Sequence, residues 1–467
     1  MPKKLSSDQR AEVVRLLAQG QDRISIAAML GISPAQVSAV QAHIKMGTYS
    51  LPGVNEGSVD LAGLNRQISR DKREGGVQDH LARVLLGTDV EMGRDVYWTP
   101  DPRSGLANPH VMVIGESGFG KTYTVACMLA ELARKGIHSI VFDYGQGFSL
   151  DTAPETFVHV SNPLEIHASR DGVEINPLQV FSSDVHGPVN VAQRVADTFA
   201  RVYPKIGVQQ HAVIRQAALD LMGDYGILPE AEETWIAELP PFNAIEEKLQ
   251  RYANGYGKVQ PRIASLVASH ISTMFVFRTF REGGRKLAWS KMLESKNMVF
   301  VIQLKGLEHS LERAVTEFLL WNLIGYAEAL GPGGLRCFVV LDEAHKLSFA
   351  PGSPVERLLR EGRKYGLGII LASQQADDFS PVAFSNTATK IVFQVADEGG
   401  NISRQLARKV KNNHSFNQIY QVITKLPRGN AYVVTDNHGA VVSIAAFEER
   451  VNRWQNEIRN EPGSPRH

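Results

Sequence analysis

The chain has 467 residues, of which 43% are hydrophobic and 21% are charged, a composition typical of globular proteins that excludes extensive disorder. Its 50 basic and 49 acidic residues leave a net charge of +1, which excludes a strongly basic nucleic-acid coat but not a basic channel shared by several subunits. No stretch reaches the roughly 18 apolar residues of a membrane span, and two cysteines are too few for a disulfide framework. We therefore expect a cytoplasmic protein of about three domains, without membrane insertion.

Residues 1–46 predict a small all-α helix-turn-helix module. Apolar residues recur at helical spacing in two short segments that end at Gly20 and Gly31. Ser33 and Pro34 then form a helix start, and a third apolar stripe follows. Because the module is only mildly basic, contact with DNA and docking to a partner protein or another copy both remain open.

From residue 88 onward strands alternate with helices, which predicts an α/β fold with a mainly parallel central sheet covered on both faces. The predicted strands cover residues 110–115, 139–142, 298–304, 337–341, 368–371, 390–395 and 431–434, and a helix is predicted over 120–136. We assign residues 47–87 to a linker with one or two short helices, 88–187 to the first part of the core, 188–290 to a mainly helical insertion, 291–450 to the second part of the core and 451–467 to a C-terminal tail.

A complete P-loop pattern, G-x-x-x-x-G-K-[ST], follows the first predicted strand. We assign the residues of this pattern to nucleotide binding and add Tyr123, the next residue of the helix. The full set is Gly115, Glu116, Ser117, Gly118, Phe119, Gly120, Lys121, Thr122 and Tyr123. The glycines let backbone N–H groups surround phosphate oxygens, and the helix N-terminus adds partial positive charge. We expect Lys121 to reach the β- and γ-phosphates of ATP and the Thr122 hydroxyl to ligate Mg²⁺. A chance glycine-rich turn is the alternative, which the flanking strand and helix disfavour.

Two adjacent acids, Asp342 and Glu343, follow the strand at residues 337–341. At the carboxyl end of such a strand, Asp342 would hold the Mg²⁺ shell and Glu343 would polarise the attacking water. A solvated pair of strand-end acids is the alternative for this pattern alone. Gln374 follows the next buried strand, where it could hydrogen-bond the γ-phosphate or be a plain loop amide.

A helix between these two strands ends in a basic cluster. Arg363 is the candidate for an arginine finger that reaches the γ-phosphate of a neighbouring subunit, and Arg360 is the second candidate. An ordinary helix C-terminus, where the dipole favours cations, is the alternative.

Asp143 and Gln146 follow the strand predicted over residues 139–142. They could lie near the nucleotide, or they could form a structural turn. Residues 278–286 are basic and could contact phosphates in a channel or form a solvated hairpin tip.

These segments together resemble the HerA/FtsK superfamily of ring-forming, DNA-translocating ATPases, and its HerA-type branch looks closest. The resemblance covers roughly residues 85–450. It rests on G-E-S-G-F-G-K-T, V-V-L-D-E-A-H-K-L, R-K-Y-G-L-G-I-I-L-A-S-Q-Q and N-T-A-T-K-I-V-F-Q-V. The Walker motifs are shared by many P-loop NTPases, and the R-K-Y-G block after D-E-A-H narrows the choice to this superfamily.

The resemblance implies a RecA-like (ASCE) ATPase core, a homohexameric ring with ATP sites between subunits, and double-stranded DNA in the central channel. The HerA-type branch includes ATPases of restriction and anti-phage systems, so we expect a defence or DNA-processing complex with an effector or nuclease partner. HerA proteins usually begin with a small β-barrel that docks a nuclease, and a helix-turn-helix and linker occupy that position here. The alternatives to a DNA translocase are a nucleotide-switched ring scaffold that activates an effector enzyme and a conjugation-type DNA pump.

Overall fold

The computed structural model describes residues 7–18, 23–32, 36–37, 40, 82–277, 279–280, 284–374, 379–410, 414–435 and 438–459. The chain divides into two compact units. One comprises Met1–His80, Leu178–Asp197 and Val208–Ala268, and the other comprises Leu81–Pro177, Thr198–Gly207 and Ser269–His467. The second unit contains the P-loop and every other residue that the sequence assigns to the ATP site.

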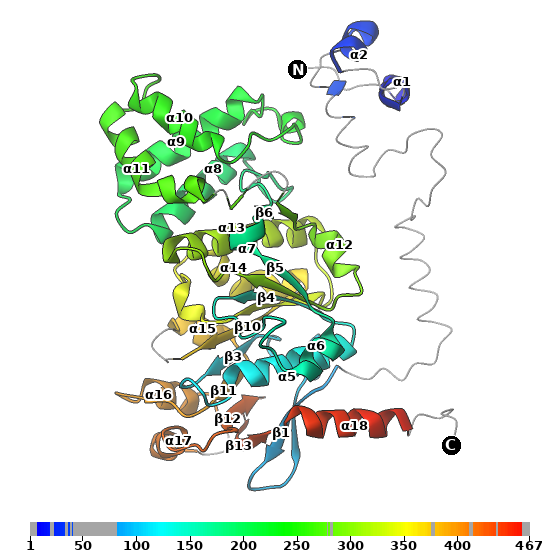
Figure 1. The fold of residues 1–467 in the computed structure, drawn as a ribbon, viewed down its shortest axis with the longest axis vertical. Coiled ribbons are helices and arrows are strands. Elements are labelled where there is room, and N and C mark those ends of the chain that lie inside the picture. Colours follow the sequence, from blue (N-terminus) through cyan, green and yellow to red (C-terminus); the bar gives the residue numbers. More distant parts are fainter. Residues whose placement is uncertain are drawn as a thin grey trace. The chain divides into compact units, whose positions relative to one another are not determined.

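An 11-stranded sheet forms the centre of the second unit, in the order β2-β1-β13-β12-β11-β3-β10-β9-β4-β8-β5 (Figure 1). The strands are β1 (Val84–Asp89), β2 (Asp95–Trp98), β3 (Val111–Ile114), β4 (His138–Asp143), β5 (Leu164–His167), β8 (Val299–Gln303), β9 (Cys337–Leu341), β10 (Leu367–Ser373), β11 (Thr389–Val392), β12 (Asn430–Thr435) and β13 (His438–Ile444). From β11 to β5 all neighbours are parallel, whereas β12, β13, β1 and β2 continue the sheet antiparallel. The predicted α/β fold with a mainly parallel sheet is confirmed.

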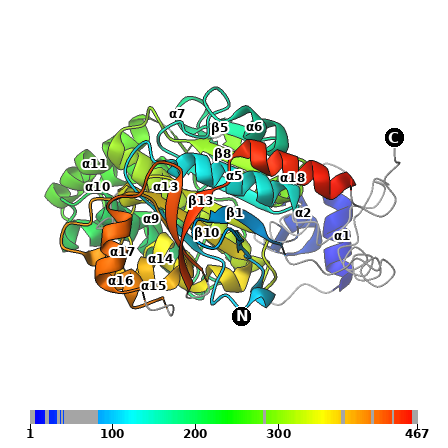
Figure 2. The same ribbon diagram turned by 90° about the horizontal axis from the view of Figure 1, so that it is seen from below.

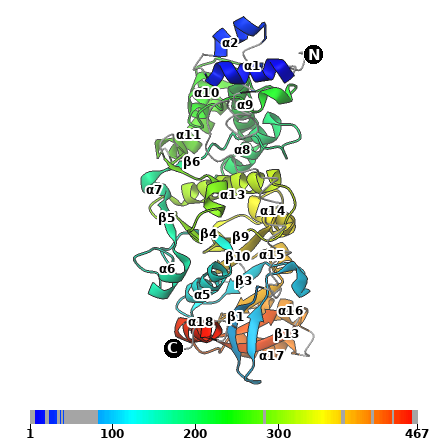
Figure 3. The ribbon, with the colours of Figure 1, turned by 90° about the vertical axis from the view of Figure 1, so that its right-hand side faces the viewer.

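Helices cover both faces of this sheet. Figure 3 shows α5 (Lys121–Arg134) and α6 (Glu155–Ser161) on one face and α14 (Pro354–Glu361) and α15 (Pro381–Asn386) on the other. The central strands β3, β9 and β10 are buried throughout, which explains why their sequences are continuous apolar runs rather than alternating ones. The remaining helical segments of this unit are η1 (Pro102–Ser104), α7 (Ala168–Asp171), α12 (Trp289–Leu293), α13 (His309–Ala329), η3 (Ala344–Lys346), η4 (Gly362–Tyr365), α16 (Asn401–Ala407), α17 (Phe416–Ile423) and α18 (Phe447–Arg459).

The described part of the first unit is helical. Its insertion contains α9 (Val208–Asp224), η2 (Glu232–Thr234), α10 (Ala244–Ala253) and parts of α8 (Pro188–Val202) and α11 (Pro261–Val276). The N-terminal segment contains α1 (Ser7–Ala18) and α2 (Arg23–Leu30), whose apolar faces share a core with Val37 and Val40. Most of the predicted third helix, and residues 47–81 of the predicted linker, lie outside the described residues. Within the described part of the chain, no helix is both long enough and apolar enough to span a membrane.

Two segments differ from the boundaries that the sequence suggested. Residues 84–87, assigned to the linker, begin β1, which pairs with β13 and β2. Residues 451–459, assigned to the tail, continue α18, because Trp454 is buried in the core of the unit. The basic segment 278–286 is only partly described: Arg285–Lys286 form β7, which pairs with β6 (Val173–Glu174).

One buried arginine fastens α18 to the rest of the unit. Arg450 is fully buried, and its guanidinium pairs with Glu131 of α5 at 2.9 Å and donates to the carbonyl oxygens of Ala445 (3.1 Å) and Leu86 (3.4 Å). Figures 1 and 2 show α18 beside α5. Burial raises the pKa of Glu131, and the charge of Arg450 opposes that rise. The first turn of α18, strand β1 and the P-loop helix α5 are therefore joined by one charged side chain.

Arg450→Ala should lower the free energy of unfolding by about 3–5 kcal/mol, because Glu131 would be left buried without its cation. Arg453→Ala is the matched control on the same helix, since Arg453 pairs with Asp95 in a partly exposed position and such pairs contribute about 1 kcal/mol or less. Denaturant unfolding followed by circular dichroism measures both. Similar losses in the two variants would contradict the role given to Arg450.

Candidate active site

The P-loop joins the end of β3 to the start of α5. Its first turn is held by neighbouring strand ends, because Gly115 N donates to Ser373 O (3.3 Å) and Glu116 N donates to Gln394 O (2.8 Å). Gly115 has a φ of 155°, and a Cβ there would lie 2.5 Å from Cβ of Phe393. Glycine is therefore required at this position both for the backbone conformation and for the close approach.

Lys121 is the first residue of α5 and is buried. Its ammonium group donates to the carbonyl oxygens of Gly115 (2.7 Å) and Glu116 (3.0 Å), so it lies across the loop. Burial lowers the pKa of Lys121, while the charges of Glu343 and Asp342 act to raise it. The free backbone N–H groups at the start of α5 lie beside this cation, and together they form a site suited to phosphate.

Thr122 and Asp342 meet at Gly147, in the loop that follows β4. A Cβ on Gly147 would lie 2.7 Å from Cγ2 of Thr122 and 3.8 Å from Oδ2 of Asp342. Burial raises the pKa of Asp342 to about 7, and the charges of Asp143 and Glu343 add to that rise. A divalent cation would offset this accumulated negative charge, and the Asp342 carboxylate and the Thr122 hydroxyl are both oxygen ligands of the kind that Mg²⁺ prefers. The described residues contain no group of three or more His, Cys, Asp or Glu side chains that could hold a metal, so phosphate and water would have to complete its shell.

The Glu343 carboxylate accepts one side-chain hydrogen bond and lies beside an imidazole. Gln374 Nε2 donates to its Oε1 at 2.8 Å, and Nδ1 of His345 lies 3.2 Å from its Oε2. The backbone of Glu343 is left-handed, with φ 54° and ψ 49°, a conformation that is unusual for a residue other than glycine and often found at functional sites. Because β9 and β10 are adjacent and parallel, their carboxyl ends bring Asp342, Glu343 and Gln374 to the same edge of the sheet.

The two arginine-finger candidates lie away from this group. Arg363 is in η4, immediately before β10, whereas Gln374 follows β10. Seven strand residues at roughly 3.3 Å each place the two on the order of 20 Å apart. The Arg363 guanidinium donates to the carbonyl oxygen of Ala107 in its own chain, and the exposed Arg360 pairs with Glu356. Neither arginine joins the P-loop of its own chain.

The side chain of Tyr123 contacts α18. Its hydroxyl accepts a hydrogen bond from Phe447 N (2.9 Å), and the two rings meet edge to face with their centres 5.4 Å apart. The assignment of Tyr123 to nucleotide binding stays a prediction, and these contacts leave its backbone at the start of α5 as the part that could serve it.

Two features near the site were missed or left open by the sequence. Arg428, before β12, has Nη2 only 3.7 Å from the Cβ position of Gly118, and its guanidinium lies 5.9 Å from the centre of the Phe119 ring. The sequence around Arg428 contains no nucleotide-binding motif. Its position near the P-loop follows only from the pairing of β12 with β11.

The Asp143 side chain stabilises the turn that follows β4. The carboxylate accepts hydrogen bonds from Gly145 N (2.9 Å), Phe148 N (2.9 Å) and Gln303 Nε2 (2.8 Å), so it shapes the turn that carries Gly147. Gln146 has a different partner, because its Oε1 accepts a hydrogen bond from Lys305 Nζ at 2.6 Å. The structural-turn interpretation of this segment therefore accounts for both contacts.

Comparison with known families identifies the region around the P-loop. Residues 103–323 match the family described as helicase HerA, central domain. The resemblance to HerA inferred from the sequence is confirmed by this match, and the chain is a P-loop ATPase. Asp342, Glu343 and Gln374 follow the matched segment in the chain.

Two HerA relatives are similar over most of the chain, and both are named DNA double-strand break repair helicase HerA. The protein from Sulfurisphaera tokodaii is 22% identical over 438 residues, which is 87% of this chain and 76% of the relative. The protein from Sulfolobus acidocaldarius is 20% identical over 396 residues, which is 80% of this chain and 72% of the relative.

Solved structures share the fold of the HerA-type core. VirB4 of Thermoanaerobacter pseudethanolicus superposes with a TM-score of 0.61 at 18% identity, over 79% of this chain and 97% of that one. The unbound form of the bacterial conjugative coupling protein TrwB gives a TM-score of 0.52 at 14% identity, over 78% of this chain and 88% of that one. The RecA-like fold expected from the sequence is therefore confirmed.

Proposed function

We propose that this protein is an ATP-hydrolysing motor that acts on double-stranded DNA as a hexameric ring. The observation that carries the proposal is the contact between Gln374 Nε2 and Glu343 Oε1 at 2.8 Å, which joins two strand ends beside a complete P-loop. The names of the HerA relatives, which are DNA double-strand break repair helicases, support DNA as the partner. TrwB in complex with a non-hydrolysable ATP analogue, with a TM-score of 0.51, supports ATP as the nucleotide.

In this proposal the residues of the site divide the work of hydrolysis. Lys121 exchanges its carbonyl contacts for oxygens of the β- and γ-phosphates, and the N-terminal N–H groups of α5 bind the same anion. Thr122 and Asp342 would hold Mg²⁺, which would supply charge neutralisation at the phosphates. Glu343 accepts a proton from a water whose oxygen attacks the γ-phosphorus, and the bond to the departing ADP oxygen breaks. Gln374 positions Glu343 and hydrogen-bonds the γ-phosphate.

The placement of Arg363 supports a ring. It lies at the opposite end of β10 from Gln374 and is exposed, so in a closed ring it could serve the site of the adjacent copy. We propose Arg363 as the arginine finger, with Arg360 as the second candidate. The HerA-type resemblance supports a role in an anti-phage defence or DNA-processing complex with an effector or nuclease partner. Cys127 and Cys337 are buried free thiols, which suits a reducing cytoplasm.

The proposal predicts that Lys121→Ala weakens ATP binding by about 10–100-fold, because a charge-assisted contact to phosphate contributes roughly 1.5–3 kcal/mol. Isothermal titration with a non-hydrolysable ATP analogue measures this affinity. Lys135→Ala, at the exposed end of α5, is the matched control and should bind as the unmodified chain does. Equal affinities in the two variants would contradict the role of Lys121.

Action on DNA needs a separate test. ATP turnover should rise when double-stranded DNA is added, and a third strand annealed to that duplex should be displaced only while ATP is hydrolysed. Lys121→Ala should abolish the displacement. If DNA changes neither turnover nor the third strand, the translocase proposal fails, and a nucleotide-switched scaffold becomes the better account of the same ATPase site.

A further inference from the structure

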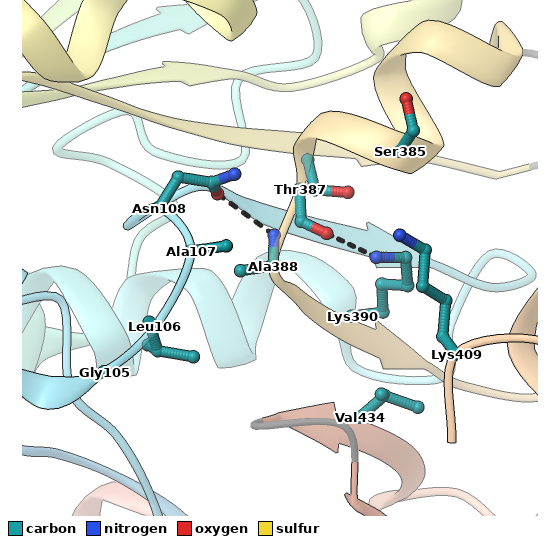
Figure 4. Close-up of a pocket in the computed structure, with 10 residues that line it drawn as sticks. All are labelled: Gly105, Leu106, Ala107, Asn108, Ser385, Thr387, Ala388, Lys390, Lys409 and Val434. Atoms are coloured by element: carbon teal, nitrogen blue, oxygen red, sulfur yellow. Dashed lines mark hydrogen bonds between the residues drawn. The ribbon is translucent and has the colours of Figure 1, made fainter. Parts of the chain in front are cut away.

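A cavity of about 190 Å³ lies at the edge of the sheet opposite the P-loop (Figure 4). Its walls come from the segment that precedes β3 and from the chain between the end of α15 and the start of β11. One residue after α16 and one from β12 complete the lining. The P-loop follows β3, whereas the residues Gly105–Asn108 that line the cavity precede it. The cavity is therefore separate from the candidate ATP site.

A buried lysine faces this cavity. Lys390 of β11 is only 1% exposed, and its Nζ donates to the carbonyl oxygen of Thr387 and lies 4.7 Å from the centre of the Phe384 ring. An ammonium group has three donors, so one carbonyl does not satisfy it. In the described part of the chain no carboxylate offsets the charge, and burial together with the charge of Lys409 lowers the pKa of Lys390 to about 7.

A second lysine reaches the same cavity from another element. Lys409 follows α16; it is an exposed residue that lines the cavity. Figure 4 shows the two ammonium groups on the same side of the cavity, beside Thr387. Two cations that face one cavity repel each other, and a buried charge is costly unless an opposite charge pairs with it. An anion between them would remove both costs.

The size and lining of the cavity restrict that anion. Sites for drug-sized ligands have volumes of roughly 300–1,000 Å³, so about 190 Å³ excludes a whole nucleotide and admits a small oxyanion. None of the described lining residues is acidic. The wall beside β3 is fixed, because Asn108 Oδ1 accepts hydrogen bonds from Ala388 N and His110 N, both at 3.1 Å.

We propose that this cavity is a binding site for a phosphate-type oxyanion, held by the ammonium groups of Lys390 and Lys409. The proposal is independent of the function proposed for the P-loop. Two sources share this chemistry: free phosphate, and the terminal phosphate of a nucleotide presented by another copy of the chain. In either case, the bound anion would link the segment that precedes β3 to β11 and to the residue after α16.

The test uses the full chain with Lys121→Ala, so that the P-loop contributes little, and titrates inorganic phosphate calorimetrically. One phosphate should bind per chain. Adding Lys409→Gln should weaken binding about ten-fold or more, as expected for loss of a charge-assisted contact. Adding Arg408→Gln is the matched control, since Arg408 is the neighbouring exposed cation and does not line the cavity; it should leave the affinity unchanged.

A second variant separates binding from folding. Lys390→Met keeps most of the side-chain volume and removes the buried charge, so without phosphate its Tm should equal or exceed that of the Lys121→Ala parent. The rise in Tm that phosphate produces in the parent should disappear. Absence of phosphate binding in the parent, together with ATP binding by the chain that keeps Lys121 which Lys409→Gln leaves unchanged, would overturn the proposal. Double variants that bind phosphate as tightly as the parent would overturn it as well.

Parallel titrations with ATP, in chains that keep Lys121 so that a neighbouring P-loop can hold the nucleotide, identify the source of the oxyanion. If inorganic phosphate binds to the Lys121→Ala chain and Lys409→Gln weakens that binding, the site takes the free ion. If phosphate does not bind and Lys409→Gln weakens ATP binding to the chain that keeps Lys121, the site takes a terminal phosphate presented by another copy. The phosphate titration does not use the P-loop, so the two proposals can fail separately.

Discussion

Replacing Glu343 by glutamine should slow ATP hydrolysis by about 10²–10⁴-fold, which is the usual contribution of a positioned general base. An amide cannot accept the proton of the attacking water, yet it retains the shape of the side chain and a carbonyl oxygen for the hydrogen bond from Gln374 Nε2. Affinity for ATP should stay within a few-fold, because Lys121 and the P-loop backbone are unchanged. Single-turnover hydrolysis and equilibrium binding of ATP measure the two quantities separately.

The control for Glu343→Gln is the same chemical change at an exposed acid of the same unit. Glu361 ends α14, and its carboxylate lies 3.6 Å from Arg357 Nε, so Glu361→Gln removes one surface charge and should leave turnover unchanged. Turnover of Glu343→Gln near that of the unmodified chain would reject Glu343 as the base. A large loss of ATP affinity in the same variant would instead show that Glu343 acts in binding.

Arg363→Ala should reduce turnover by roughly 10³–10⁵-fold, the range known for arginine fingers that stabilise charge developing on the γ-phosphate. Its ATP affinity should stay within a few-fold, since Arg363 lies at the far end of β10 from the P-loop of its own chain. The hydrogen bond to Ala107 O is exposed, so its loss should lower the free energy of unfolding by only about 1 kcal/mol. A thermal melt therefore distinguishes lost catalysis from lost folding.

Mixing inactive subunits tests whether Arg363 acts on a neighbour. In mixed rings of Arg363→Ala and Lys121→Ala chains, an intact P-loop on the first can face an intact Arg363 on the second. Some hydrolysis should then return, which a residue acting within its own chain would not allow. Mixed rings that form and remain inactive would reject the assignment, and rescue seen only with Arg360→Ala would move the finger one helical turn earlier.

The candidate site could be predicted largely because parallel strands share a direction. The apolar run before Asp342 and the one before Gln374 each indicated a buried strand, and both ends had to meet at one edge of the sheet. Strand order was not needed for that step. By contrast, Arg428 reaches the P-loop only through the antiparallel pairing of β12, and no local pattern records that pairing.

The edge of the sheet was missed for a different reason. Gly87 is the last residue of the segment assigned to a linker. A Cβ there would lie 1.9 Å from Ser443 O, so the glycine permits a close approach of two strands. Arg450 and Lys390 were also unforeseen as buried groups, since charged side chains are rarely fully buried. Their burial depends on partners and cavities that only the folded chain assembles.

The pairing of β1 with β13 also fixes when the ATPase core can be completed during synthesis. The Arg450 contact to the carbonyl oxygen of Leu85 joins positions 365 residues apart, near the beginning and the end of the core. At about 5–20 residues per second, the ribosome needs on the order of tens of seconds to supply β13 after β1 has emerged. During that interval β1 and β2 form a hairpin without its partner strand, and a chain cut before residue 438 would retain this open edge permanently. Chaperone demand and sensitivity to C-terminal truncation should therefore be concentrated at this edge rather than at the P-loop.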